Sequence, residues 1–207
     1  MRFGEVMRKI WNFIWHSNSI WSWIVNIILA FVIIKFLLYP GLGLVLGTSH
    51  PIVAVVSNSM EHDYGFDEWW DSTALCNGEQ CTQGDFYKGF DITKAKFLEF
   101  RFRNGFNKGD VMFLKGVEPL RIEVGDIIVF KSGRPDPIIH RVVKIWNVDD
   151  KYFFQTKGDR NYGSISSPSL NEMQISEEQL VGRALFRIPY LGWIKIGFVR
   201  MIGFFVR

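Results

Sequence analysis

The sequence contains one long apolar stretch, from Ile20 to Tyr39, in which Lys35 is the single charged residue. About 20 residues at about 1.5 Å per residue extend about 30 Å, which is the thickness of the hydrocarbon layer of a membrane. Lys35 lies near the end of the stretch, where its side chain can reach the polar interface. We therefore predict one transmembrane anchor within residues 19–46, with a helix break at Pro40 and Gly41.

A cleaved signal peptide is the alternative interpretation of this stretch. The apolar part of a signal peptide covers roughly 7–15 residues and precedes a cleavage site of small residues, whereas this run is longer and no clear site of that kind follows it. Arg2, Arg8 and Lys9 precede the stretch. By the positive-inside rule they predict a cytoplasmic N-terminus and place everything after the anchor on the non-cytoplasmic side.

Two further segments are predicted to lie at the membrane surface. Residues 1–18 repeat apolar side chains at helical spacing with polar side chains between them, which is typical of an amphipathic interfacial helix. Residues 193–207 are apolar and aromatic, but a spanning helix there would bury Lys195 or Arg200 in hydrocarbon, at a cost of several kcal/mol per charge. We predict an interfacial segment, with a second span as the alternative.

The net charge of +3 is unevenly distributed. Residues 47–186 carry 16 Lys/Arg and 20 Asp/Glu, a net charge of −4, whereas the two apolar ends carry 8 Lys/Arg against Glu5, a net charge of +7. Because the basic residues accompany the apolar ends, they favour contact with anionic membrane lipid and argue against nucleic acid as a partner.

The central region, residues 47–192, is predicted to be an antiparallel β domain, so the fold class is mainly β. Six short stretches are rich in β-branched and aromatic residues and are bounded by Gly, Pro, Asp or Asn; they cover residues 51–56, 110–114, 125–130, 137–146, 152–156 and 180–188.

Residues 61–108 separate the first two predicted strands and have the character of an insertion, with a short helix at residues 93–103. Within the insertion, Cys76 and Cys81 are predicted to form a disulfide in an oxidising, non-cytoplasmic compartment, with free thiols as the alternative.

Three short motifs carry side chains that can do chemistry. Ser57-Asn58-Ser59-Met60 follows the first strand, and a serine that leaves a buried strand can act as a nucleophile if a base lies beside it. Taken alone, the motif is more simply an ordinary turn. His140 lies within a strand, where it is either a half-buried, hydrogen-bonded histidine or that base.

The other histidines are less suited to catalysis. His16 lies in the interfacial helix, His50 lies just beyond the span, and His62 is most simply a solvated loop residue. The third motif, Thr156 to Asn161, contains Gly158-Asp159, which is either a turn or the source of an acid that orients an imidazole.

In combination, the ordered motifs resemble type I signal peptidases. The motifs are Ser57 to Met60, Lys108 to Val111, Gly125 to Phe130, Ile139 to Val143, Thr156 to Asn161 and Ile188 to Gly192. A histidine where the bacterial branch has a lysine makes the chain similar to the archaeal and endoplasmic-reticulum branch. The resemblance covers residues 51–192 but not the insertion.

The resemblance implies a role for each matching residue. Ser59 matches the nucleophile, His140 the general base and Asp159 a family acid. Ser57, with the Ser59 amide, is expected to hold the oxyanion. Asn58 stands where the family usually has glycine.

A second departure follows Asp159. The family usually has a further acid a few residues later, but the next acid here is Glu172. Asp159 or Glu172 could therefore orient His140, or the enzyme could work as a dyad.

The resemblance predicts a membrane-bound serine endopeptidase that cleaves N-terminal signal peptides from secreted and membrane precursors. It implies no cofactor and no metal, location in a plasma or endoplasmic-reticulum membrane, and association with the secretion machinery. The alternative is a catalytically inactive membrane-anchored binding module on the same β domain.

Overall fold

The computed structural model describes residues 3–194, 196 and 197. The chain forms two compact units, Met1–Val45 and Leu46–Arg207. Residues 195 and 198–207, and with them most of the predicted C-terminal interfacial segment, lie outside the described residues.

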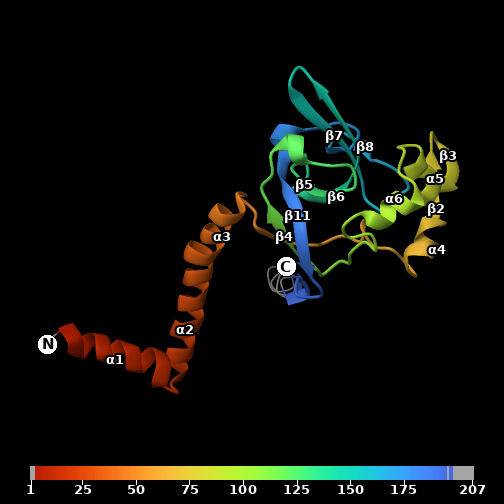
Figure 1. Cartoon of the computed structure of the whole chain (residues 1–207). Helices are drawn as coiled ribbons and strands as arrows, with labels where there is room; N and C mark the ends of the chain where they lie inside the picture. The colour runs from red at the N-terminus through yellow and green to blue at the C-terminus, as the bar shows by residue number, and fades with distance from the viewer. Residues whose placement is uncertain (1–2, 195, 198–207) are drawn as a thin grey trace. The chain divides into compact units, whose positions relative to one another are not determined.

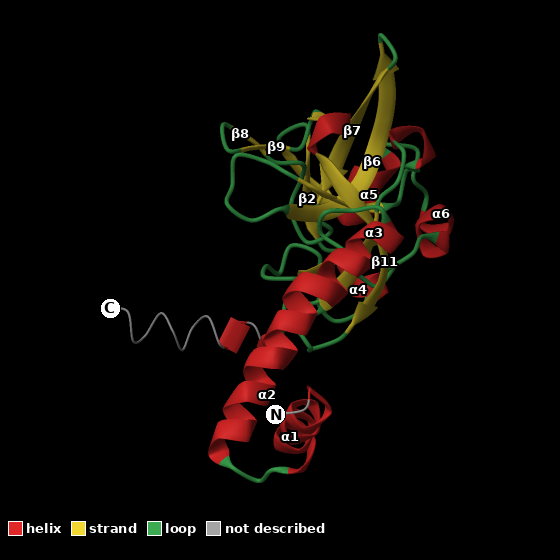
Figure 2. Cartoon of the chain, turned by 90° about the vertical axis from the view of Figure 1, so that its left-hand side faces the viewer, coloured by secondary structure: helices red, strands yellow, loops and turns green. Residues whose placement is uncertain are grey.

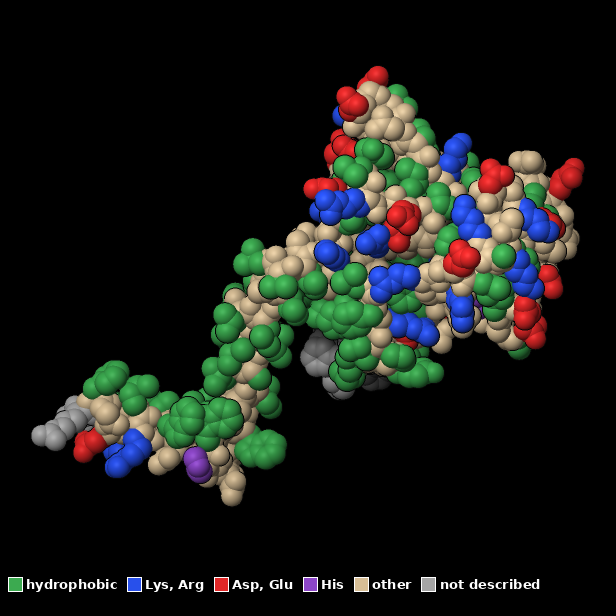
Figure 3. Space-filling model, viewed as in Figure 1, with side chains coloured by type: hydrophobic (Ala, Val, Ile, Leu, Met, Phe, Trp, Pro, Cys, Tyr) green, Lys and Arg blue, Asp and Glu red, His purple; other side chains and the backbone are tan. Residues whose placement is uncertain are grey.

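The first unit is helical. Helix α1 (Phe3–His16) is followed by α2 (Ile20–Ile33), the π-helical turn η1 (Ile34–Leu38) and α3 (Tyr39–Leu46). The continuous helix Ile20–Leu46 has 27 residues and a mean hydropathy of 2.3, and hydrophobic side chains cover it in Figure 3. The prediction of an N-terminal apolar helix long enough to cross a membrane is confirmed.

The predicted helix break at Pro40 and Gly41 is wrong, because the helix continues to Leu46. Proline lacks the N–H that an α-helix needs, and its ring collides with the preceding turn. The π-helical turn Ile34–Leu38 lies just before Pro40. A π turn is wider than an α turn, and it accommodates the proline without ending the helix.

The second unit contains a seven-stranded antiparallel sheet with the strand order β1-β4-β11-β5-β6-β7-β10 (Figures 1 and 2). Its strands are β1 (Ile52–Ala54), β4 (Val111–Lys115), β5 (Ile127–Phe130), β6 (Ile138–Val148), β7 (Lys151–Lys157), β10 (Ile175–Ser176) and β11 (Leu180–Ile188). All six predicted strands are present, and the mainly β fold class is confirmed. Asp149 and Asp150 join β6 to β7 with φ values of 51° and 60°, as in a tight two-residue hairpin turn.

Short elements complete the unit. They are the strand pair β8 (Ser166–Ser167) and β9 (Leu170–Asn171), and the 3₁₀ turns η2 (Pro119–Arg121) and η3 (Glu177–Gln179). Two apolar clusters form the core of the sheet. One surrounds Met112, Leu114 and Ile127, and the other surrounds Phe130 and Phe154.

The insertion is a folded subdomain. It contains α4 (Phe66–Trp70), the hairpin β2 (Thr73–Cys76) and β3 (Glu79–Thr82), α5 (Gln83–Lys88) and α6 (Lys94–Glu99). These elements gather at one side of the sheet in Figure 1. The predicted helix and the Cys76–Cys81 disulfide are both present.

The insertion has its own aromatic core. Trp69, Trp70, Tyr87 and Phe97 are buried there against Val143 of β6. Because Val143 belongs to the sheet, the insertion shares an apolar interface with the β domain and is not an independent appendage.

Candidate active site

Ser59 lies just beyond β1, in a loop that is fixed on both sides. Before it, the Val55 amide donates to the Asp110 carbonyl at 2.8 Å. After it, Met60 is buried in the core of the sheet. The Ser59 carbonyl accepts from the Arg160 amide at 2.9 Å, so the serine backbone is tied directly to the loop that follows β7.

His140 presents its ring to Ser59 from β6. Pairing with Ile128 of β5 fixes the register of His140 in the sheet, and the residue is only 4% exposed. Its Nε2 lies 2.8 Å from the Ser59 hydroxyl. This distance is within the range at which a base can accept the proton of a serine.

Glu172 completes a hydrogen-bonded chain behind His140. It follows β9, is completely buried, and places Oε1 at 2.5 Å from His140 Nδ1. The same oxygen accepts from the Thr156 hydroxyl at 2.9 Å, and Oε2 accepts from the Ile165 amide at 2.9 Å. With Nδ1 donating to Glu172, Nε2 is left to accept the proton of Ser59.

Gly158 leaves room for this contact. A Cβ at this position would lie 2.8 Å from both His140 Nε2 and the Ser59 carbonyl oxygen. Any side chain there would enter the space between the serine loop and the histidine, so glycine is required by close approach.

Ser57 lies beside Ser59, with 3.1 Å between the two hydroxyl oxygens. Both hydroxyls and the Ser59 amide therefore gather at one point in the loop. Groups of this kind can donate to a negatively charged oxygen.

Asp159 belongs to a different cluster. Its carboxylate accepts from Arg141 Nε at 2.9 Å and Nη2 at 2.6 Å, and from the Tyr87 hydroxyl at 2.9 Å. It also lies 2.9 Å from His62 Nε2. Among the described residues, none of its hydrogen bonds comes from His140, whose carboxylate partner is Glu172.

Arg141 holds the Asp159 carboxylate in its charged form. Burial by itself raises the pKa of Asp159, but the charge of Arg141 and the hydrogen bonds from His62 and Arg141 outweigh burial and keep the pKa well below its usual value. Beside this pair, burial lowers the pKa of Lys157 to about 7, against the charges of Asp159 and Glu172.

The prediction that His62 is a solvated loop residue is wrong. Its side chain is 1% exposed and stacks on Trp69, with 3.7 Å between the ring centroids. His62 lies at the start of the insertion, and the residues that follow it fold back so that Trp69 packs on the His62 ring. No local sequence pattern indicates this long-range contact.

Further insertion residues bind the loop after β7. Trp69 Nε1 donates to the Asp159 carbonyl at 2.9 Å. Gln83 accepts from Lys157 Nζ at 2.6 Å and donates to the Asn161 carbonyl at 3.1 Å. Trp69, Gln83 and Tyr87 were not found by sequence reasoning, because their partners lie more than 70 positions away in the chain.

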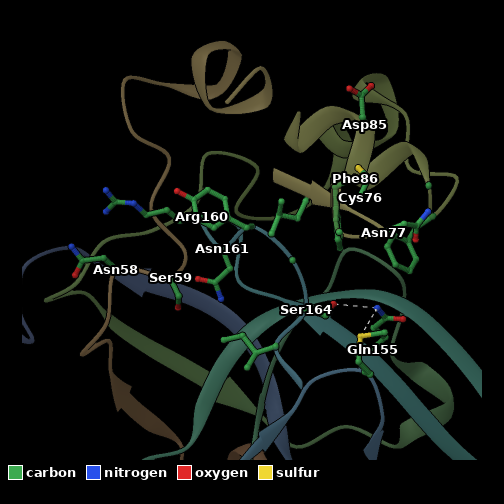
Figure 4. Close-up of a pocket in the computed structure, with 18 residues that line it drawn as sticks. Asn58, Ser59, Cys76, Asn77, Asp85, Phe86, Gln155, Arg160, Asn161 and Ser164 are labelled. Atoms are coloured by element: carbon green, nitrogen blue, oxygen red, sulfur yellow. Dashed lines mark hydrogen bonds between the residues drawn. The ribbon is translucent and has the colours of Figure 1, made fainter. Parts of the chain in front are cut away.

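A cleft of about 1110 Å³ opens beside Ser59 (Figure 4). Asn58 and Ser59 line it at the hydroxyl, the insertion contributes residues 75–78, 85, 86, 89 and 90, and β7 and the chain after it contribute Gln155, residues 160–165 and Met173. Among the described residues, no group of three or more His, Cys, Asp or Glu side chains could hold a metal ion.

A hydroxyl, an imidazole and a buried carboxylate in hydrogen-bonded sequence, next to an open cleft, form the arrangement that serine hydrolases use. No family model matches the sequence. The chain is, however, 36% identical over 96 residues to the signal peptidase complex catalytic subunit SEC11C of Homo sapiens, covering 44% of this chain and 49% of that protein.

Two other relatives give the same result. The signal peptidase complex catalytic subunit SEC11 of Candida tropicalis is 35% identical over 94 residues, covering 44% of this chain and 56% of that protein. The corresponding subunit of Dictyostelium discoideum is 34% identical over 94 residues, with coverage of 44% and 52%. The chain spans about half the length of the curated relatives it matches, and the predicted resemblance to signal peptidases of the endoplasmic-reticulum branch is confirmed.

Replacing Asp159 by Asn is expected to destabilise the protein. The substitution leaves the buried guanidinium of Arg141 without its counter-charge, and breaking a buried ion pair on one side costs about 3–5 kcal/mol. Chemical denaturation of the solubilised full chain measures this loss. Asp67→Asn is the matched control, because Asp67 pairs with Lys94 but is 76% exposed, and such pairs contribute at most about 1 kcal/mol.

The stability difference between wild type and Asp159→Asn is also expected to depend on pH. The folded-state pKa of Asp159 is below the unfolded value, which is about 3.9. Ionised Asp159 therefore stabilises the fold fully above that value, and the stabilisation is lost as the pH falls below it. Denaturation at a series of pH values should show a constant difference above about pH 5 and a smaller one below about pH 4; a difference that grows on acidification would contradict this assignment.

Proposed function

We propose that this protein is a membrane-bound serine endopeptidase that removes N-terminal signal peptides from secreted and membrane precursors. The observation that carries the proposal is the hydrogen-bonded series Ser59, His140 and Glu172 in a chain similar to signal peptidase catalytic subunits. The precursors are its substrates, and other members of a signal peptidase complex are its expected partners.

In this mechanism His140 Nε2 takes the proton of Ser59 as its oxygen attacks the scissile carbonyl. The Ser59 amide and the Ser57 hydroxyl donate to the oxyanion that forms. The leaving amine takes the proton from His140, and water activated by the same imidazole then releases the acyl group from Ser59.

Glu172 has the role of the third member. It fixes the ring of His140 through Nδ1 and stabilises the positive charge that the imidazole gains. Asp159 is a positioning residue: it holds the loop from which Arg160 donates to the Ser59 carbonyl. Of the three arrangements that the sequence left open, the contacts favour Glu172 as the orienting acid.

The anchor explains part of the specificity. A predominantly apolar helix of 27 residues keeps the enzyme in the membrane that also holds the apolar signal segment of its precursor. Sharing one membrane raises the effective concentration of substrate and limits cleavage to bonds near the surface.

Ser59→Ala and His140→Ala are each expected to lower kcat at least about 10³-fold, because each removes a group on which the attack depends. The measurement is cleavage of a signal-bearing precursor by the purified enzyme in lipid. Ser49→Ala is a matched control, since Ser49 also contacts a histidine, His50, at 2.9 Å but lies before β1. Full activity in the Ser59 or His140 variant would refute the proposal.

Glu172→Gln is expected to lower kcat by about 10²–10⁴-fold with little change in KM. The amide keeps the size of the side chain but no longer stabilises the imidazolium or fixes its tautomer. Glu178→Gln is the control, because Glu178 is 65% exposed and pairs with Lys151 at the surface. An unchanged kcat in Glu172→Gln would leave a Ser59–His140 dyad as the mechanism.

The topology is testable with one substitution. Glu79→Thr converts the exposed segment Asn77-Gly78-Glu79 into an N-glycosylation acceptor, and the wild-type sequence contains no such triplet. If the β domain faces the non-cytoplasmic side, the variant expressed in a reticulum membrane gains a glycan that a glycosidase removes. An unglycosylated variant alongside a glycosylated control protein would contradict this orientation.

A further inference from the structure

The cleft beside Ser59 is larger than the chemistry of one bond requires. Its volume of about 1110 Å³ is slightly above the range for pockets that enclose whole small ligands. Figure 4 shows it extending from Asn58 and Ser59 past Asn161 toward Phe86 and Gln155. A cavity of this size next to a nucleophile has room for a segment of polypeptide.

The two walls of the cleft present apolar side chains. Leu75, Phe86 and Phe90 come from the insertion, and Tyr162, Ile165 and Met173 come from the chain after β7. Three of them are well exposed in the free protein: Leu75 at 44%, Tyr162 at 60% and Met173 at 46%. Apolar surface that faces a cleft can be removed from water by a ligand with apolar side chains.

The walls are fixed relative to each other. The Leu75 amide donates to the Tyr162 carbonyl at 2.8 Å, and the disulfide between Cys76 and Cys81 closes the hairpin that carries Leu75. A preformed cleft binds with less ordering of its own side chains and backbone than a mobile one.

The cleft also contains an unused donor near the nucleophile. Asn161 Nδ2 is buried and has no hydrogen-bond partner among the described residues. It would lie 2.6 Å from a Cβ on Gly158, the position that is also 2.8 Å from His140 Nε2. Buried donors are normally paired, and because Asn161 lines the cleft, a turn of its side chain toward the cleft would let this amide donate to a ligand carbonyl.

We propose that this cleft is an extended substrate-binding site, in which the insertion selects an apolar side chain of the precursor close to the scissile bond. Asn161 donates to a main-chain carbonyl of the same precursor segment, and Leu75 and Met173, which both line the cleft, contact the selected side chain. The inference rests on the proposed function and adds to it a substrate preference that originates in residues 61–108.

The test combines enzyme and precursor variants. A precursor that the enzyme cleaves is prepared as a series of variants. Each variant has either Leu or Asp at one position within five residues of the scissile bond on either side, and the small residues next to the bond are not changed. For wild type we expect kcat/KM to favour Leu over Asp at least about 10-fold at one or two adjacent positions. In the double variant Leu75→Ala, Met173→Ala this ratio should fall close to 1 at those positions.

The control pair is Leu98→Ala, Leu120→Ala. Leu98 is 38% exposed and Leu120 is 62% exposed, and neither lines the cleft. The control should keep the wild-type ratios. The proposal is overturned if wild type shows no selective position, or if the cleft variant keeps the ratios or lowers cleavage of every precursor by the same factor.

Asn161→Ala provides a separate readout. Because a main-chain contact does not depend on the side chain bound, kcat/KM should fall about 5-fold or more for all precursors while the Leu-to-Asp ratios stay as in wild type. Unchanged kcat/KM would remove Asn161 from the site. If wild type cleaves no precursor at all, the proposed function fails; if it cleaves without a preference that depends on the cleft, only this inference fails.

Discussion

The fold around the site depends on one buried guanidinium. Arg141 is completely buried, and a charge in that position is costly unless all its donors are satisfied. A guanidinium has five N–H groups. Arg141 uses them on both Asp159 oxygens and on the carbonyls of Arg101, Phe102 and Gly125, and its charged end lies 4.6 Å from the centroid of the Phe97 ring.

Besides the turn at Gly125, these contacts join three parts of the chain. Arg141 belongs to β6, Asp159 to the loop after β7, and Arg101, Phe102 and Phe97 to the insertion. Because His140 precedes Arg141 on the same strand, the two side chains point to opposite faces of the sheet. One face therefore carries the imidazole that contacts Ser59, and the other carries the ion pair that holds the loop after β7.

The ion pair also explains why Asp159 and Glu172 contact different partners. Both oxygens of the Asp159 carboxylate are already hydrogen-bonded, to Arg141, Tyr87 and His62. Neither oxygen is therefore available to orient His140. Glu172 reaches His140 from a separate strand pair, with its remaining oxygen held by the Ile165 amide. The absence of an acid soon after Asp159 in the sequence is thus compensated in space by a residue 13 positions later.

The strands and the apolar helix could be predicted because their signals are local. Short runs rich in β-branched and aromatic residues mark β5 and β6, and a long apolar run marks the helix from Ile20. Ser59 and His140 could be singled out because short motifs carry them, and the structure brings their side chains within 2.8 Å of each other. The choice of Glu172, the burial of His62 and the continuation of the helix through Pro40 depend on contacts or backbone adjustments that no single segment encodes.

The insertion was the least predictable part of the fold. It makes many contacts with the site, and no local sequence pattern reveals them. Its side chains form hydrogen bonds with Lys157, with the Asp159 carboxylate and carbonyl, and with the Asn161 carbonyl. The insertion therefore helps to hold the loop whose Arg160 amide donates to the Ser59 carbonyl. The same subdomain supplies one wall of the cleft. Since the insertion both contacts the loop after β7 and lines the cleft, a substitution that shifts the aromatic core around Trp69 and Tyr87 would also move that loop. The proposed selectivity is therefore best tested at Leu75, which is exposed on the hairpin, and not at Phe86, which packs against that core.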